Sequence, residues 1–539
     1  MNSSHGRTER YSWDIDTVAF VVLATVLGAY VRLAPVLSSD FPLNDGALFS
    51  AMVGDLQNAG YRLPEFANFN SHQIPYAYPP LGFYVAGLLV DIFKWNLLDV
   101  VRILPAVFSV LTIPAFYLLA REILKSTSQA VIAVFAFALV PRSFEWLIMG
   151  GGLSRAPGFF FSILAIYCAY LMYTRLSNKY FVYTAIFFGL TILSHPEMAW
   201  NVLIAIGLFL LFVNHSQKAF YKTILVGVGV FLISTPWWLS VVLSHGLPTL
   251  MAGFRSGYNI YLFIGPFLGF NFGDELFLQL VGLLGLLGFF VCVFKKQFLL
   301  PVWFFSIFIL SPRSGATNAT LPLSMLAGIG MDLIITASTI VILPSTSPQV
   351  GGTGQNISGI ENLLQNRFSR WFVGFFIIFL LIGAAILPVF RPDTLKAISL
   401  EEREAMYWVA DHTPAVSKFL IITSLESFGV DGVSEWFPYF SDRENLTLVQ
   451  GSEWVPGGYA SKWWSYLEVQ RCANDDKVCL DDWADERNED FTHVYITKFR
   501  PGGVKSDRGL LISLNNSDEY DRIYDTGSVA IFERKLDKE

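Results

Sequence analysis

The stretch Asp40-Phe-Pro-Leu-Asn-Asp45-Gly46 joins an apolar run to a segment with the character of a helix. The run before it, residues 17–37, is long enough to cross a hydrocarbon core about 30 Å thick. The segment after it, residues 46–59, is predicted to be a helix lying at the membrane surface. We therefore expect Asp45 at a turn that opens this helix, where its carboxylate can be held toward a substrate. A plain helix-capping role is the alternative.

The whole chain is too apolar for a water-soluble protein of its length. Of its 539 residues, 53% are hydrophobic and 16% aromatic, and the mean hydropathy is +0.48. Apolar runs of spanning length recur to about Leu387, after which charged residues become frequent and no run is long enough to span. We expect a polytopic α-helical membrane domain, residues 1–389, followed by a soluble α/β domain, residues 390–539.

Charge separates these two parts. From Phe390 onward the tail has 17 Lys and Arg against 28 Asp and Glu, a net charge of −11, whereas the whole chain carries −7. The membrane part is therefore slightly basic. Its basic pairs all lie on one side if residues 78–95 rest on the surface instead of crossing, and the positive-inside rule makes that side the cytoplasm. The pairs are Arg7/Arg10, Arg121/Lys125, Arg175/Lys179, Lys218/Lys222, Lys295/Lys296 and Arg367/Arg370.

This arrangement predicts about eleven spans, with the N-terminus in the cytoplasm and the tail outside the cell membrane. One long outer loop, residues 38–99, then holds two surface helices, residues 46–59 and 79–95. The spans are expected near residues 17–37, 100–120, 128–142, 157–174, 180–194, 197–213, 220–243, 276–294, 297–310, 320–343 and 371–389.

The tail has the pattern of a small α/β domain. Strands are predicted at residues 418–424, 493–498, 519–524 and 528–534, the last two joined by a hairpin. Two aromatic-acidic clusters, Glu435-Trp436-Phe-Pro438 and Gly451-Ser-Glu453-Trp454, either stack on a sugar ring or pack a core. Cys472 and Cys479 either close a disulfide in an oxidising compartment or stay free thiols.

Polar residues gather at the outer ends of the predicted spans, and such residues are usually functional when paired at membrane depth. A sugar carried on a lipid phosphate brings an anionic leaving group to the membrane surface, where Arg or His can hold its charge. The acceptor needs a carboxylate as base, alone or with a divalent metal. The outer residues are Asp40, Asp45, Arg102, Glu145, Arg155, His195, Glu197, Arg255 and Arg313.

Asp45 is the candidate catalytic base, and Glu145 is the candidate second acid unless it is a solvated loop charge. Arg155 ends the segment Gly150-Gly-Gly-Leu-Ser-Arg155, whose backbone amides are open to a phosphate; the alternative is an arginine that only reaches the interface. Arg313 is a further candidate substrate contact with the same alternative. His195 and Glu197, which flank Pro196 in a tight corner, are candidate substrate contacts, with a satisfied buried His–Glu contact as the alternative. Arg102 either binds substrate or anchors a span.

These features together resemble a known superfamily. A first span, then Asp45 opening a helix, then Tyr78-Pro-Pro-Leu81 and Arg102-Ile-Leu-Pro105, is similar to the GT-C glycosyltransferases, among them protein O-mannosyltransferases, the aminoarabinose transferase and the oligosaccharyltransferase catalytic subunit. Gly46 stands where mannosyltransferases usually have Glu, and Tyr78 where a basic residue often precedes Pro-Pro. The resemblance covers residues 17–330 and implies no particular member.

The resemblance implies that the chain transfers a sugar from a polyprenyl-phosphate donor to a glycan, lipid or protein acceptor at the outer face, with Asp45 as the family's first-loop acid. Tyr78 is kept as a candidate substrate contact, and metal dependence stays open. The expected partners are the lipid-linked donor, membrane lipids and the acceptor, with no nucleic acid. A transporter or flippase of lipid-linked saccharides, or a membrane scaffold whose outer domain binds a partner, are the alternatives.

Overall fold

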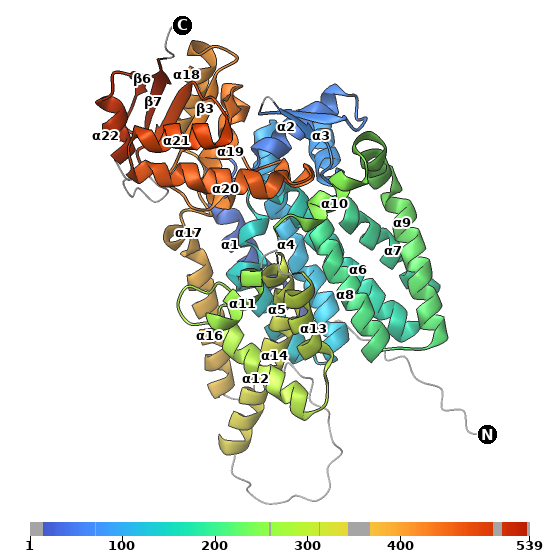
Figure 1. Ribbon diagram of the computed structural model, residues 1–539. Helices are drawn as coiled ribbons and strands as arrows, with labels where there is room; N and C mark the ends of the chain where they lie inside the picture. Colours follow the sequence, from blue (N-terminus) through green and yellow to red (C-terminus); the bar gives the residue numbers. More distant parts are fainter. Residues whose placement is uncertain are drawn as a thin grey trace, which may run out of the picture.

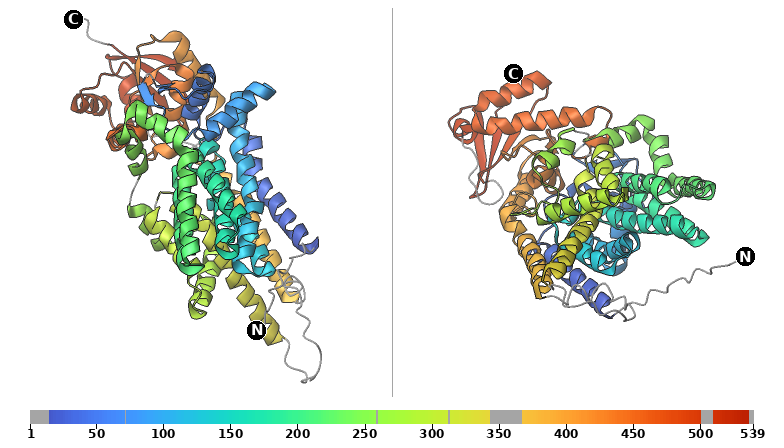
Figure 2. Two further views of the ribbon diagram at one scale, coloured as in Figure 1. Left: turned by 90° about the vertical axis from the view of Figure 1, so that its right-hand side faces the viewer. Right: turned by 90° about the horizontal axis from the view of Figure 1, so that it is seen from below.

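The computed structural model describes residues 15–70, 72–257, 260–311, 313–342, 367–499 and 509–535. It is mostly helical, which confirms the predicted class. Figures 1 and 2 show a bundle of long helices with an α/β part, built from the C-terminal residues, at one end. Arg7 and Arg10 lie outside the described residues.

Each predicted span coincides with a helix. Six described helices, α1, α4, α6, α9, α14 and α16, are long and apolar enough to cross a membrane. α5 with the 3-10 turns that follow it, Pro141–Leu147, would make a seventh span bent by 81°. A total of eleven spans therefore stays a prediction. The bundle helices are α1 (Ile15–Ser38), α4 (Leu97–Leu124), α5 (Thr127–Leu139), α6 (Gly152–Arg175), α7 (Asn178–Ser194), α8 (Pro196–Phe212), α9 (Gln217–His245), α12 (Leu280–Phe294), α13 (Leu299–Leu310), α14 (Gly315–Ile342) and α16 (Arg367–Ala385).

Polar caps start several of these helices within an otherwise apolar sequence. The side chain of Asn96 accepts a hydrogen bond from the amide of Leu98 at the start of α4, and Ser126 and Ser216 cap α5 and α9 in the same way. α9 exposes large apolar side chains such as Phe231 and Leu232. An apolar surface of this kind on a long helix is typical of contact with lipid.

The loop that follows α1 forms its own layer at the end of the bundle that carries the α/β part (Figure 1). It holds α2 (Ala47–Asn58) and α3 (Leu81–Phe93), which are the two predicted surface helices. α3 has 13 residues, too few to cross a membrane. Between them lies an antiparallel hairpin of β1 (Phe66–Phe69) and β2 (His72–Pro75), which the sequence analysis did not predict. Two further short helices, α10 (Leu247–Arg255) and α11 (Ile260–Leu268), lie in the predicted outer segment after α9.

The C-terminal residues build a five-stranded mixed sheet in the order β4-β3-β5-β7-β6. β3 is parallel to β4 and β5, and the hairpin β6–β7 is antiparallel, as its turn sequence predicts. All four predicted strands are present, and Cys472 is bonded to Cys479. The elements are α17 (Leu387–Phe390), α18 (Leu400–His412), β3 (Lys418–Ile422), α19 (Gly432–Ser441), β4 (Glu444–Asn445), α20 (Gly458–Arg471), α21 (Lys477–Arg487), β5 (His493–Thr497), α22 (Gly509–Asn515), β6 (Tyr520–Asp525) and β7 (Val529–Arg534).

The α/β part packs directly on the loop that follows α1. The rings of Phe41 and Trp436 meet edge to face with centroids 4.6 Å apart. The indole Nε1 of Trp436 donates to the carbonyl of Asn44 at 2.9 Å, and the Asn44 side chain donates to the carbonyl of Gly429 at 2.8 Å. Arg403 pairs with Asp40 beside them. Residues 41–46 are therefore enclosed between the bundle and the α/β part, whereas Asp40 stays exposed.

Candidate active site

Asp45 is held by the start of α6. Its Oδ1 accepts a hydrogen bond from the amide of Gly151 at 2.7 Å, and its Oδ2 lies 2.7 Å from Nη2 of Arg155. The side chains of Asp45 and Arg155 are each about one fifth exposed, at 22% and 21%. α2 has no side-chain cap, so Asp45 does not serve as its N-cap. The carboxylate is instead fixed at the N-terminus of α6, where the helix dipole favours negative charge.

Glycine is required where the two segments meet. A Cβ on Gly150 would lie 1.9 Å from the carbonyl oxygen of Asp45, and a Cβ on Gly151 would lie 2.2 Å from its Oδ2. Gly46 has φ +128°, a backbone conformation that favours glycine. The sequence analysis expected the run at 150–152 to approach a phosphate, but its closest partner in the structure is the Asp45 loop.

A second ion pair lies in the corner between α7 and α8. Nε of Arg313 is 3.1 Å from Oε1 of Glu197, and the hydroxyl of Ser314 donates to the same carboxylate. Nη1 of Arg313 also donates to Oγ of Ser256 at 3.1 Å. These contacts bring the residue before α14 against the start of α8 and the end of α10.

His195 precedes α8 and interacts electrostatically with members of both ion pairs: Arg155, Arg313 and Glu197. Its Nδ1 is buried and has no hydrogen-bond partner within the described residues. The pKa of His195 is lowered to about 4, chiefly by burial; the charge of Glu197 opposes this, and the charges of Arg155 and Arg313 add to it. The imidazole is therefore neutral at physiological pH, with a ring nitrogen available to a ligand.

Tyr78 closes the same group of side chains from the loop before α3. Its hydroxyl donates to Oε2 of Glu453 at 3.0 Å, and that oxygen also accepts from the amide of Gly451 at 2.7 Å. The ring of Tyr78 meets Trp454 edge to face at 5.2 Å. Burial and the charge of Glu453 hold the pKa of the Tyr78 hydroxyl well above its usual value.

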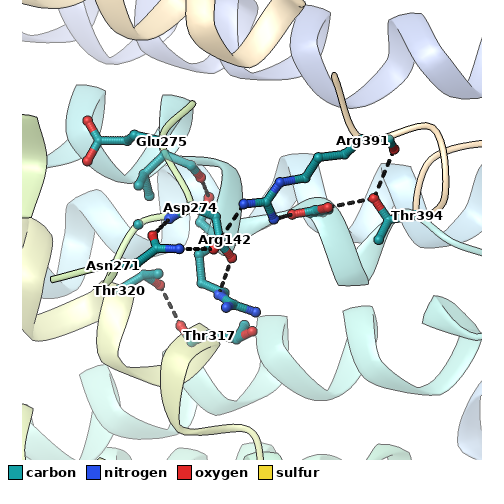
Figure 3. Close-up of polar contacts among 12 residues, drawn as sticks. Arg142, Asn271, Asp274, Glu275, Thr317, Thr320, Arg391 and Thr394 are labelled. Atoms are coloured by element: carbon teal, nitrogen blue, oxygen red, sulfur yellow. Dashed lines mark hydrogen bonds and ion pairs between the residues drawn. The ribbon is translucent and has the colours of Figure 1, made fainter. Parts of the chain in front are cut away.

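The structure thus brings six of the eight predicted site residues together: Asp45, Arg155, His195, Glu197, Arg313 and Tyr78. It does not bring Glu145 to them. Glu145 is fully buried, with Thr394 Oγ1 at 2.6 Å and Arg391 Nη1 at 3.2 Å. Arg391 also pairs with Asp274 at 3.3 Å, and Arg142 pairs with Asp274 at 2.5 Å. Figure 3 shows this network, in which the arginines and threonine converge on buried carboxylates.

The network around Glu145 ties the turns after α5 to the segment that leads from α17 into the α/β part. Because Arg391 and Thr394 bind the Glu145 carboxylate, its contacts favour a structural role. Glu145 makes no contact with Asp45 that would support its predicted role as second acid. Arg102 also lies apart: it pairs with Asp99 at 2.8 Å and donates to the carbonyl of Ser39. Its contacts are those of a residue that anchors the end of the first loop.

Two tail residues in this region were not chosen as site residues from the sequence. Glu435 of α19 accepts a hydrogen bond from the amide of Gly46 at 3.1 Å, and Glu453 contacts Tyr78. Both belong to the aromatic-acidic clusters noted in the sequence, but Trp436 and Trp454 are 0% and 5% exposed. The tryptophans pack the interface, and the acids beside them are what reach the site.

No metal-binding cluster accompanies these side chains. Within the described ranges, no group of three or more His, Cys, Asp and Glu side chains is arranged to hold a metal ion. Both oxygens of Asp45 are engaged by Gly151 and Arg155. Metal dependence therefore stays as open as the sequence left it.

Comparisons with known proteins agree with this architecture. Residues 77–242 match the family model described as dolichyl-phosphate-mannose-protein mannosyltransferase. No curated protein matches the chain in sequence. The oligosaccharyltransferase of Archaeoglobus fulgidus, tethered with an acceptor peptide containing an NVT sequon, superimposes with a TM-score of 0.56 over 89% of this chain and 69% of its own, at 14% identity. The chain has the fold of the GT-C membrane glycosyltransferases.

Two other GT-C structures are similar over nearly the whole chain. ArnT from Cupriavidus metallidurans, bound to undecaprenyl phosphate, has a TM-score of 0.50 at 15% identity and covers 96% of this chain and 97% of its own. The mycobacterial arabinofuranosyltransferase AftD has a TM-score of 0.53 at 14% identity and covers 97% of this chain and 40% of its own. Identities this low establish the shared GT-C fold and leave substrates to be argued from the site.

Proposed function

We propose that this GT-C protein transfers a sugar from a polyprenyl-phosphate carrier to an acceptor at the outer face of the cell membrane. The observation that carries the proposal is the Asp45 carboxylate, held in the first outer loop by Gly151 and Arg155. Structures with this fold include one in complex with a dolichol-phosphate and an inhibitory peptide, and one bound to undecaprenyl phosphate. Both are consistent with a lipid-phosphate leaving group.

Asp45 acts in this mechanism as the general base. It takes the proton from the acceptor's O–H or N–H as that oxygen or nitrogen forms a bond to the anomeric carbon of the sugar. The bond from that carbon to the phosphate oxygen breaks, its electron pair stays on the phosphate, and the carrier leaves as polyprenyl phosphate. Protonation of Asp45 removes the negative charge that faces Arg155. The guanidinium can then stabilise the charge that develops on the leaving phosphate.

Arg313 and His195 complete the proposed donor site. Arg313 pairs with Glu197 and donates a hydrogen bond to the hydroxyl of Ser256. A guanidinium can also bind phosphate oxygens through two parallel hydrogen bonds. Neutral His195 offers a buried ring nitrogen to a sugar hydroxyl or phosphate oxygen. Tyr78 and Glu453 border the group on the side of the α/β part.

The proposed membrane arrangement has eleven spans, a cytoplasmic N-terminus and residues 390–539 as an extracytoplasmic domain. Basic residues support it at the end of the bundle away from Asp45: Arg175, at the end of α6, pairs with Glu122 of α4 at 2.8 Å, and Lys222 of α9 donates to the carbonyl of Leu176. The bond between Cys472 and Cys479 suits an oxidising compartment.

Purified protein in liposomes tests this function without any variant. A panel of polyprenyl-phosphate sugars, labelled in the sugar, is offered with external glycan, lipid and peptide acceptors. The proposal predicts stoichiometric appearance of free polyprenyl phosphate and labelled acceptor. Movement of intact donor across the bilayer without cleavage would instead identify a flippase, and inertness toward the whole panel would favour a scaffold.

A further inference from the structure

The first turn of α19 packs closely against the catalytic loop, by which we mean residues 41–46, the stretch that holds Asp45. A Cβ on Gly432 would lie 2.6 Å from the carbonyl oxygen of Asn44, so the backbones approach as closely as glycine allows. Trp436 donates to that same carbonyl from one turn further along the helix. Together these contacts place Glu435, between them in sequence, directly over the start of α2.

Glu435 is a buried carboxyl with one oxygen used and one left over. Its Oε1 accepts from the amide of Gly46 at 3.1 Å, and the side chain is only 3% exposed. Its Oε2 is buried and has no hydrogen-bond partner within the part of the chain that the structure describes. A buried carboxylate with an unsatisfied oxygen is costly, whereas a protonated carboxyl leaves less charge unpaired.

The charges around Glu435 come from three other segments. Asp45 directly precedes Gly46, whose amide donates to Glu435, and Arg155 of α6 forms the ion pair with Asp45. The hydroxyl of Tyr78, in the loop before α3, interacts electrostatically with Glu435. Burial, and then the negative charge of Asp45, raise the pKa of Glu435 to about 8, against the amides of Gly46 and Leu48 and the charge of Arg155.

We propose that Glu435 is a positioning residue for the reaction, contributed by the C-terminal α/β part: its carboxyl accepts the Gly46 amide, fixes that peptide beside Asp45 and, when neutral, adds no second negative charge there. This rests on the proposed function of Asp45 as general base. It makes α19 a component of the active site, so that the α/β part does more than shield the membrane domain.

Ionisation of Glu435 would change the site in two ways. It would place a second negative charge beside Asp45, where an anionic lipid phosphate must bind, and it would bury a charge without a partner. Both effects disfavour the competent arrangement. Activity should therefore fall on the alkaline side, as Glu435 loses its proton.

The pair of variants Glu435→Gln and Glu435→Ala tests the proposal. Gln keeps an acceptor for the Gly46 amide and stays neutral at every pH. One pH unit above a pKa, about one tenth of a carboxyl remains protonated. We therefore expect Glu435→Gln to match wild type near pH 6.5 and to exceed it by about tenfold at pH 9. Glu435→Ala, which loses the acceptor and cannot ionise, should keep kcat at about one tenth of the wild-type value at pH 6.5 across the whole pH range, with little change in the donor KM at pH 6.5.

Glu404→Gln, an exposed acid on α18, is the matched control and should follow the wild-type profile. The proposal is overturned if Glu435→Gln shows the same alkaline decline as wild type, or if Glu435→Ala is as active as wild type at pH 6.5. A fold defect in the alanine variant leaves the glutamine comparison intact.

A second readout does not need activity. Because the pKa of Glu435 is raised in the folded state, the folded protein keeps a proton that the unfolded chain has lost between about pH 4.5 and 8, and stability falls across that window. The thermal midpoint of wild type relative to Glu435→Gln should therefore decline from pH 5 to 8 and then level off. If wild type is inactive on every donor but this decline appears, the proposed transferase function is wrong and the neutral state of buried Glu435 is confirmed. If the midpoints of wild type and Glu435→Gln run parallel with pH, Glu435 is not neutral in the folded protein.

Discussion

Arg155 holds the carboxylate of Asp45 at 2.7 Å across 110 residues of chain. The pair joins the first outer loop to the first turn of α6, and it neutralises the candidate base in the absence of substrate. Because the arginine and the amide of Gly151 fix both carboxylate oxygens, the position of Asp45 is set before an acceptor arrives. Changes to either partner should therefore act on catalysis before they act on folding.

Arg155→Lys should lower kcat/KM by about tenfold to a hundredfold. A lysine keeps the charge but cannot hold Asp45 and a phosphate oxygen in a fixed planar geometry. Steady-state kinetics with the active donor measure the effect, and Arg62→Lys, an exposed arginine in the loop that also holds Asp45, is the control. Equal rates for Arg155→Lys and wild type would show that the ion pair does not orient the base.

Gly151→Ala should abolish most activity, by about a hundredfold or more, because its Cβ would occupy the place of Asp45 Oδ2. Gly227→Ala in α9 is a matched control, since a Cβ there meets nothing within 4 Å. Transfer activity at equal protein amounts is the measurement. A Gly151→Ala variant with wild-type turnover would mean that Asp45 can move away from α6 without loss.

Trp436→Phe should destabilise the protein by about 1–2 kcal/mol, because the buried carbonyl of Asn44 loses its donor while the ring packing on Phe41 is largely kept. Trp464→Phe is the control, since Trp464 is 54% exposed. Chemical unfolding in detergent gives the two values. If both substitutions cost the same, the contact between α19 and the catalytic loop contributes nothing measurable.

Glu145→Gln should cost stability and spare catalysis. The substitution leaves Arg391 without one carboxylate partner, at a cost of about 1–3 kcal/mol for a pair that is only partly shielded from water. Turnover of the folded variant should stay within about threefold of wild type. A loss as large as that of an Asp45 variant would restore Glu145 as the second acid, despite its distance from the Asp45 contacts.

Local pattern predicted most of the fold. Apolar runs gave helices at all eleven predicted positions. The segment at 78–95, predicted to rest on the membrane surface, contains the 13-residue helix α3, and its surface position stays a prediction. The tail strands followed from β-branched and aromatic runs. The hairpin β1–β2 was missed, because a stretch such as Phe66-Ala-Asn-Phe69 is too short to show alternation.

Site residues could be predicted where they lie in the first loop or at the end of an apolar run, as Asp45 and Arg155 do. Glu435 was not, because its importance comes from a contact with Gly46 that spans 389 residues. The run that begins at Gly150 was predicted to approach a phosphate, but it packs against Asp45. A sequence shows that glycine allows close approach and does not show which group approaches it. Glu145 lies in a turn after α5, where the sequence predicted a loop, but its partner Arg391 comes from beyond the last bundle helix.

The most direct test of the central claim is sugar transfer from a labelled polyprenyl-phosphate donor by membranes that carry wild type, Asp45→Asn or Glu65→Gln in equal amounts. Glu65 is an exposed acid of the same outer loop and serves as the control. The account predicts that Asp45→Asn loses about a hundredfold or more, as expected when a general base is removed, while Glu65→Gln behaves as wild type. Equal transfer by Asp45→Asn and wild type would contradict the role of Asp45.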